Sequence, residues 1–120
     1  MRHLKEGPGW RLGYDPDADI FKGLVGGDRW AVEMTQPEFA DFCRIALQLA
    51  ETLQSMASEL MAEERITCEQ ETAHIWVEVE GFPIQYSLRF ILLQGRRTEG
   101  AWPATVTSAL LQAIPALTLF

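Results

Sequence analysis

The sequence predicts an α+β fold in which antiparallel sheet is covered by one long and one short helix. Three features predict it: short segments that alternate apolar and polar residues, turn residues between them, and a long apolar stripe at helical spacing. The predicted element order is β-β-β-α-β-β-β-α, one arrangement repeated twice. At 120 residues the chain has the length of one domain with one core, so residues 1–120 are predicted to form a single domain.

Three strand candidates precede the first helix, at residues 10–14, 20–25 and 29–34. The first alternates large apolar residues with others and ends at Asp15-Pro16, which is typical of a turn. Gly26-Gly27-Asp28 separates the other two, and these residues supply the positive φ that a tight hairpin needs.

A strong helix start follows at Thr35. Its hydroxyl is placed to accept from the next turn, Pro37 suits an early helical position, and Glu38 completes the spacing of a capping box. The predicted helix runs from Gln36 to about Glu63, roughly 40 Å at 1.5 Å per residue, long enough to overhang the sheet. The apolar stripe that predicts it consists of Phe39, Phe42, Ala46, Leu49, Ala50, Leu53, Ala57 and Leu60.

The second half contains three further strand candidates and a shorter helix. The strands are predicted at residues 66–71, 73–80 and 84–93, with a turn at 81–83 and a polar loop at 95–100. The helix is predicted to begin at Pro103, to extend to Ala113 and to be stopped by Pro115.

Composition and charge limit the classes of partner. Ten Lys and Arg against 17 Asp and Glu give a net charge of -7, which disfavours a partner with a strongly negative surface. No segment approaches the roughly 20 apolar residues that cross a bilayer, and no apolar run follows the basic residues near the start. These observations predict a cytoplasmic protein without membrane contact.

One acidic run resembles the opening of a calcium-binding loop. Asp15, Asp17 and Asp19 have the spacing of the first ligands of an EF-hand. However, Ile20 occupies the position that requires glycine, and Gly26 the position that requires a bidentate glutamate. An acidic turn between strands is therefore the favoured interpretation.

The other reactive groups also fail to form a site. Cys43 and Cys68 form no CxxC pair and are predicted to be reduced, small buried apolar side chains. A zinc site would have to join both to His74, which is predicted on the polar face of a strand, with no short-range ligand pair. No metal or cofactor is therefore predicted.

Paired carboxylates are the remaining catalytic candidates. Glu69 and Glu71, like Glu78 and Glu80, lie two apart and so share a strand face, as a general acid and base would. Any solvated strand face has the same pattern, and no nucleophile, phosphate-loop or metalloprotease motif accompanies it. The sequence thus predicts a protein that is not an enzyme.

Basic and aromatic residues in the strand candidates are the predicted contacts of a partner. They are Arg11, Lys22, Arg29, Trp76 and Arg89. Trp76, beside His74 and Arg89, could be a stacking platform for a base or a sugar. The favoured alternative is that the tryptophans anchor a sheet against a helix.

Three segments carry a family resemblance: Gly9-Trp10-Arg11-Leu12-Gly13-Tyr14-Asp15-Pro16, Gly26-Gly27-Asp28 and the helix entry at residues 35–39. In these the chain resembles a small cyanobacterial and plastid family of uncharacterised proteins. Members of that family are similar in fold to the single-stranded-DNA-binding transcriptional regulators, the class that includes the plant Whirly proteins. The resemblance implies a doubled sheet-and-helix unit, and it implies a fold more firmly than an activity.

Three functions follow as hypotheses. The first is a binding or adaptor protein that contacts another macromolecule, expected to be a protein, through the sheet face or the long helix. The second is single-stranded nucleic-acid binding by the sheet, and the third is an enzyme on small molecules. A homodimer stays open.

Overall fold

The structure, a computed structural model, describes residues 2–57, 59 and 64–117. The first antiparallel sheet contains β1 (His3–Gly7), β2 (Trp10–Tyr14), β3 (Gly23–Gly26) and β4 (Ala31–Met34), and α1 (Gln36–Met56) follows it. The second contains β5 (Ile66–Glu71), β6 (Ile75–Phe82), β7 (Gln85–Leu92) and β8 (Glu99–Trp102), followed by α2 (Ala104–Ala116). In both sheets the strands are hydrogen-bonded in sequence order.

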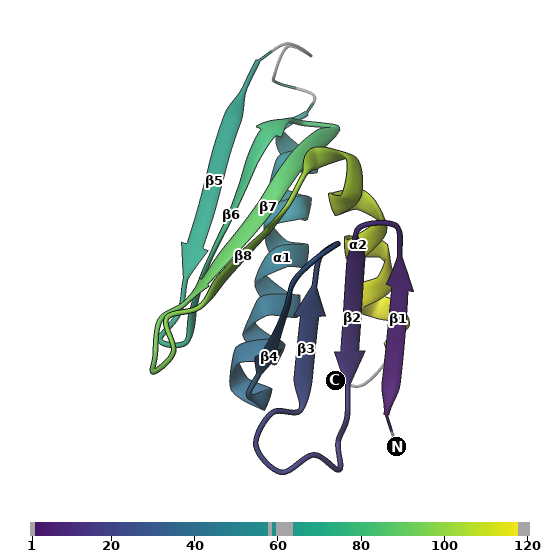
Figure 1. Ribbon diagram of the computed structural model, residues 1–120. Coiled ribbons are helices and arrows are strands. Elements are labelled where there is room, and N and C mark those ends of the chain that lie inside the picture. The colour runs from purple at the N-terminus through teal and green to yellow at the C-terminus, as the bar shows by residue number, and fades with distance from the viewer. Residues whose placement is uncertain (1, 58, 60–63, 118–120) are drawn as a thin grey trace.

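The helices cover one face of each sheet. α1 packs on strands of both sheets and passes behind them in Figure 1, whereas α2 packs on β7 and β2. The strands consequently alternate between core and solvent; β6, for example, has buried and half-buried residues in strict alternation. Each sheet therefore presents its second face to solvent.

The predicted α+β class, the antiparallel sheets and the long and short helices are confirmed, but each sheet has one strand more than predicted. β1 forms before the first predicted strand, and β8 takes the end of the predicted loop at 95–100. The sequences of β1 and β8 lack regular apolar alternation. Backbone pairing with β2 and β7 makes them strands, in the registers His3 opposite Tyr14 and Ile91 opposite Glu99.

The hairpin between β3 and β4 uses its glycines differently from the prediction. Neither Gly26 nor Gly27 has a positive φ, and Gly26 belongs to β3. A Cβ on Gly27 would lie 2.2 Å from the indole Nε1 of Trp30. Glycine is needed here because an indole ring packs on the backbone.

The helix α1 begins as predicted and ends earlier. The Glu38 amide donates to the Thr35 hydroxyl at 3.4 Å, and the Thr35 amide donates to the Glu38 carboxylate at 2.9 Å, which is a capping box. The helix ends at Met56 with Ala57 as its C-cap, so the predicted end at Glu63 is wrong; residues 58 and 60–63 lie outside the described part. Leu53 is the last buried residue of α1, because the core ends there.

The helix α2 also departs from its predicted limits. Pro103 is its N-cap, and the helix continues through Pro115 to Ala116. Pro115 does not stop the helix, because a proline in the last turn leaves only one carbonyl of the preceding turn without its donor. No side-chain bond caps the start of α2.

The core joins the two halves through an aromatic cluster. Trp102, the last residue of β8, lies between Trp30 and Phe42, with ring centroids 5.1 and 5.6 Å away, and Phe90 is 5.7 Å away. Its buried Nε1 donates to the Gly26 carbonyl at 2.8 Å. The edge of the second sheet is thereby attached to the first.

Candidate interaction surfaces

The solvent face of the second sheet brings together two of the predicted contact residues. The Cζ atom of Arg89 lies 4.9 Å from the centre of the Trp76 ring, within the range of a cation–π contact. On its other side Arg89 Nε donates to Glu78 Oε1 at 2.9 Å. The Arg89 side chain is half exposed, but its charge already has a carboxylate partner.

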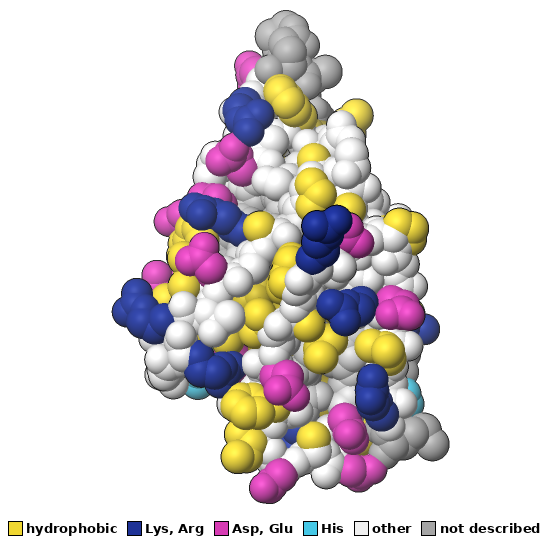
Figure 2. All heavy atoms as spheres, viewed as in Figure 1, with side chains coloured by type: hydrophobic (Ala, Val, Ile, Leu, Met, Phe, Trp, Pro, Cys, Tyr) yellow, Lys and Arg dark blue, Asp and Glu magenta, His cyan; other side chains and the backbone are white. Residues whose placement is uncertain are grey.

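This face carries more carboxylates than cations. Arg65, just before β5, pairs with Glu80 as Arg89 pairs with Glu78, so each of these arginines is matched by a glutamate. The registers place all the glutamates of the second sheet's strands on this side: Glu69, Glu71, Glu78, Glu80 and Glu99. Figure 2 shows acidic and basic side chains interspersed over this part of the surface. The surface that remains is acidic.

The other predicted contact residues lie elsewhere. Arg11 Nη2 donates to the Trp30 carbonyl at 2.8 Å, and Lys22 Nζ donates to the carbonyls of Pro16 and Ala18 at 2.9 and 2.6 Å. Arg29 is exposed in the turn between β3 and β4. The structure therefore unites Trp76 with Arg89, whereas the three cations of the first half are separate from that pair.

His74 does not lie on the polar face of a strand, as predicted, but in the turn between β5 and β6. Its amide donates to the Thr72 hydroxyl at 3.1 Å, and that hydroxyl bonds Asp41 at 2.8 Å. The Thr72 amide donates to the Ile75 carbonyl at 2.8 Å, which closes a turn that the alternation of the sequence did not indicate.

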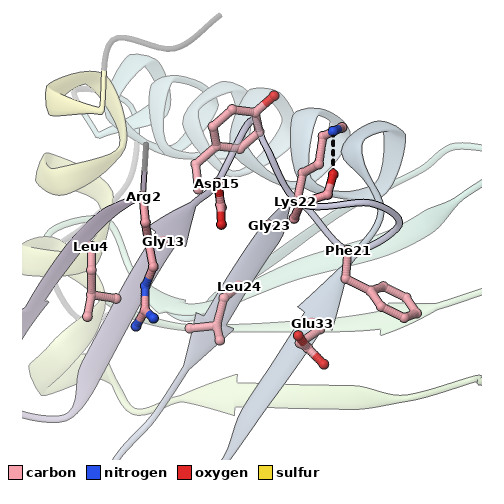
Figure 3. A pocket seen from close by; sticks show the side chains of 11 residues that line it. Arg2, Leu4, Gly13, Asp15, Phe21, Lys22, Gly23, Leu24 and Glu33 are labelled. Carbon is pink, nitrogen blue, oxygen red and sulfur yellow. Dashed lines mark hydrogen bonds between the residues drawn. The ribbon is translucent and has the colours of Figure 1, made fainter.

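A hollow of about 230 Å³ lies on the solvent face of the first sheet. Figure 3 shows Leu4 and Leu24 beside Gly13, with Arg2 and Glu33 among the other lining residues. The hollow exists because Gly13, an outward position of β2, has no side chain to fill it. Leu4 and Leu24 become neighbours of Gly13 only through strand pairing, so the sequence did not indicate this hollow.

A larger groove, about 610 Å³, lies where the two halves meet. Its apolar lining includes Pro8, Trp30, Pro103 and Val106, and Arg29 lies among its other lining residues. Sequence reasoning missed this groove because its lining comes from four separate segments that only the tertiary structure brings together.

The reactive groups are separate from these surfaces. Both cysteines are free, with Cys43 buried and Cys68 half-buried, so the predicted burial is complete only for Cys43. Burial raises the pKa of the Cys43 thiol from its ordinary 9.0 to about 12. Within the described residues no three His, Cys, Asp or Glu side chains are grouped as a metal site would require.

The acidic run at residues 15–19 forms part of the loop between β2 and β3. The Asp17 amide donates to Asp15 Oδ1 at 3.0 Å, and the Lys22 ammonium bonds the carbonyls of the same loop. The acidic run thus lies between two strands, as predicted.

Comparison with known proteins assigns the chain to a family. The model of a domain of unknown function, DUF1818, matches residues 5–117. The chain belongs to this family. It is also similar to a crystal structure of a protein of unknown function from the DUF155 family of Prochlorococcus sp. NATL2A, with 32% identity and a TM-score of 0.90. The similarity covers 97% of this chain and 98% of the other.

Neither the curated proteins nor the helices of the structure indicate a function. No curated protein matches the sequence. Among the helices of the described residues, none combines the length and the apolar character that a membrane span requires. The resemblance to a cyanobacterial family of uncharacterised proteins is thus supported by a cyanobacterial structural neighbour.

Proposed function

We propose that this DUF1818 protein is a non-enzymatic adaptor that binds another protein through the solvent face of its second sheet. The observation that carries the proposal is the charge of that face: Arg65 and Arg89 are each paired with a glutamate, and further glutamates surround them. An acidic face with a half-exposed tryptophan is suited to a protein surface that contributes cations and apolar contacts.

Single-stranded nucleic acid is the second candidate. The Trp76–Arg89 pair favours it, because an aromatic ring and a guanidinium both stack on bases. Affinity for a nucleic-acid strand depends mainly on neutralising phosphates, and Arg89 is already neutralised by Glu78. The fold likeness to the Whirly-like class is part of this same candidate.

An enzyme on small molecules has less support. A nucleophilic thiol needs a lowered pKa, whereas burial raises the pKa of Cys43.

We further propose that residues 1–120 fold as one domain, that the protein is cytoplasmic and that it needs no cofactor. The aromatic cluster around Trp102, which both halves of the chain share, supports the single domain.

The test compares two ligands. Labelled single-stranded oligonucleotides are titrated at low and at high salt, and the immobilised protein is used to retain partners from a native lysate. The adaptor proposal predicts no saturable oligonucleotide binding at low salt and a retained protein whose recovery falls in a Trp76→Ala variant. Oligonucleotide binding that weakens steeply with salt and is lost in Arg89→Ala would establish the nucleic-acid function instead.

A further inference from the structure

Each sheet has two edge strands, β1 and β4 in the first sheet and β5 and β8 in the second. The outer edges, away from the junction of the two sheets, are those of β1 and β5 (Figure 1). The opposite sides of the two sheets meet at Trp30 and Trp102, whose rings are 5.1 Å apart. An unpaired edge presents backbone donors and acceptors to any extended segment, so proteins protect edges that must stay unpaired.

The edge of β1 is protected by a charge. Lys5 lies opposite Leu12 on β2, and Leu12 is followed across the sheet by Val25 and Val32. These three apolar residues face the core, so Lys5 occupies the same row as core residues. Its side chain lines a small pocket together with Leu117 at the end of α2. Lys5 is exposed, and a strand added beside β1 would have to cover its charged side chain, which is one of the devices that prevent edge pairing.

The edge of β5 has no such protection. Its inward positions are Ile66, Cys68 and Gln70, none of them charged. Ile66 and Cys68 pack against the core yet stay half exposed. Among the described residues, β5 forms strand pairs with β6 alone. A strand added at this edge would gain backbone hydrogen bonds and would cover apolar surface.

The outward positions of β5 define the chemistry of that strand. They are Thr67, Glu69 and Glu71, and Glu69 lies directly opposite Glu78 on β6. Like charges that face each other across strands are destabilising, and an opposite charge on the next strand stabilises. In the antiparallel pairing centred on Glu69, a second copy of β5 would set Glu69 against Glu69, which disfavours that dimer of the chain with itself.

We propose that β5 accepts an extended strand of a partner protein, with lysine or arginine at every second position and small apolar residues between them. The basic side chains lie beside Glu69 and Glu71 on the solvent face, while the apolar ones lie beside Ile66 and Cys68. This inference rests on the proposed adaptor function and specifies its site and the sequence pattern of its partner.

The test uses a six-residue peptide, matched in length to β5, with alternating lysine and valine, capped at both ends and labelled with a fluorophore. Two isomers carry backbone N-methyl groups, one on the lysines and the other on the valines. Because successive strand residues direct their N–H groups to opposite edges, strand addition predicts that one isomer loses binding and the other keeps it. Attraction by charge alone would treat the isomers equally.

Paired variants locate the site. E69K/E71K is expected to weaken binding of the unmethylated peptide at least tenfold. E6K/E51K makes the same change of net charge at exposed positions of β1 and α1, and it is expected to weaken binding by much less. Equal binding of both isomers, equal effects of both double variants, or no saturable binding overturns the edge site.

The outcome is separable from that of the adaptor function. If a partner retained from lysate binds E69K/E71K as it binds the natural protein, the edge site is wrong and the adaptor function stands. If the peptide results hold but no lysate protein is retained, the edge site stands and the adaptor function lacks support. A concentration-dependent dimer that E69K/E71K abolishes would overturn the proposed basic partner in favour of a second copy.

Discussion

The two halves of the chain have the same element order, but their helices begin by different means. In the first half α1 starts at a capping box formed by Thr35 and Glu38. In the second half α2 starts at Pro103 with no side-chain cap, and Thr107 and Leu110 are buried soon afterwards. A helix with local start signals and a helix held mainly by packing can thus occupy equivalent places in a repeated arrangement.

The halves also depend on each other. Arg96, in the loop between β7 and β8, donates to Glu38 Oε1 at 3.0 Å and to the Glu33 carbonyl at 2.9 Å. Its guanidinium lies 4.7 Å from the centre of the Phe21 ring. The second half therefore contacts the very glutamate that caps α1, and we expect the two halves to unfold together.

Removing Trp102, the largest of the fully buried side chains and one that joins the halves, gives the strongest test of this dependence. Trp102→Ala is expected to lower the free energy of unfolding by about 3–5 kcal/mol, because it leaves a cavity and removes the bond to the Gly26 carbonyl. Trp76→Ala, at a half-exposed position, is the matched control and should cost much less. Urea denaturation followed by circular dichroism measures both, and two separate transitions in the natural protein would show that the halves fold independently.

Each half has one cysteine, and their burial differs. The folded protein holds the Cys43 proton until about pH 12, whereas the unfolded chain loses it above its ordinary pKa of 9.0. The unfolded state then binds fewer protons, so stability falls as the pH rises through this window, by about 1.4 kcal/mol from pH 8 to pH 10.

Denaturation at several pH values, compared with Cys43→Ala, measures this effect, because other groups contribute equally to both proteins. The same burial predicts that an alkylating reagent modifies the half-buried Cys68 in the folded protein and reaches Cys43 only after unfolding. Parallel pH profiles of the two proteins would contradict the assigned cause.

The smallest effect concerns the helix start that only α1 has. Thr35→Ala is expected to lower the free energy of unfolding by about 1 kcal/mol, because the Glu38 amide loses its acceptor. Thr35→Ser keeps the hydroxyl and should restore most of the loss. The control is Thr105→Ala in α2, because Thr105 is exposed and has no capping role, and this variant should keep the stability of the natural protein. Thermal unfolding of Thr35→Ala, Thr35→Ser and Thr105→Ala measures the difference. Equal losses of stability in Thr35→Ala and Thr105→Ala would contradict the capping role of Thr35.

The candidate surfaces could be predicted only in part. The sequence predicts Trp76 beside Arg89, and the pairing of β6 with β7 brings the two side chains together. The hollow at Gly13 and the groove beside Trp30 depend on which strands lie side by side and on which rings pack against glycine. Neither follows from periodicity along the chain.

The sequence by itself determined the α+β class, most of the strands, and the start of α1 at Thr35, because alternation and capping are local properties of neighbouring residues. The tertiary structure alone decided that His3–Gly7 and Glu99–Trp102 are strands and that α1 ends at Met56. Such features depend on backbone pairing with distant strands and on where the core ends. Both are decided by interactions between residues that are far apart in the chain.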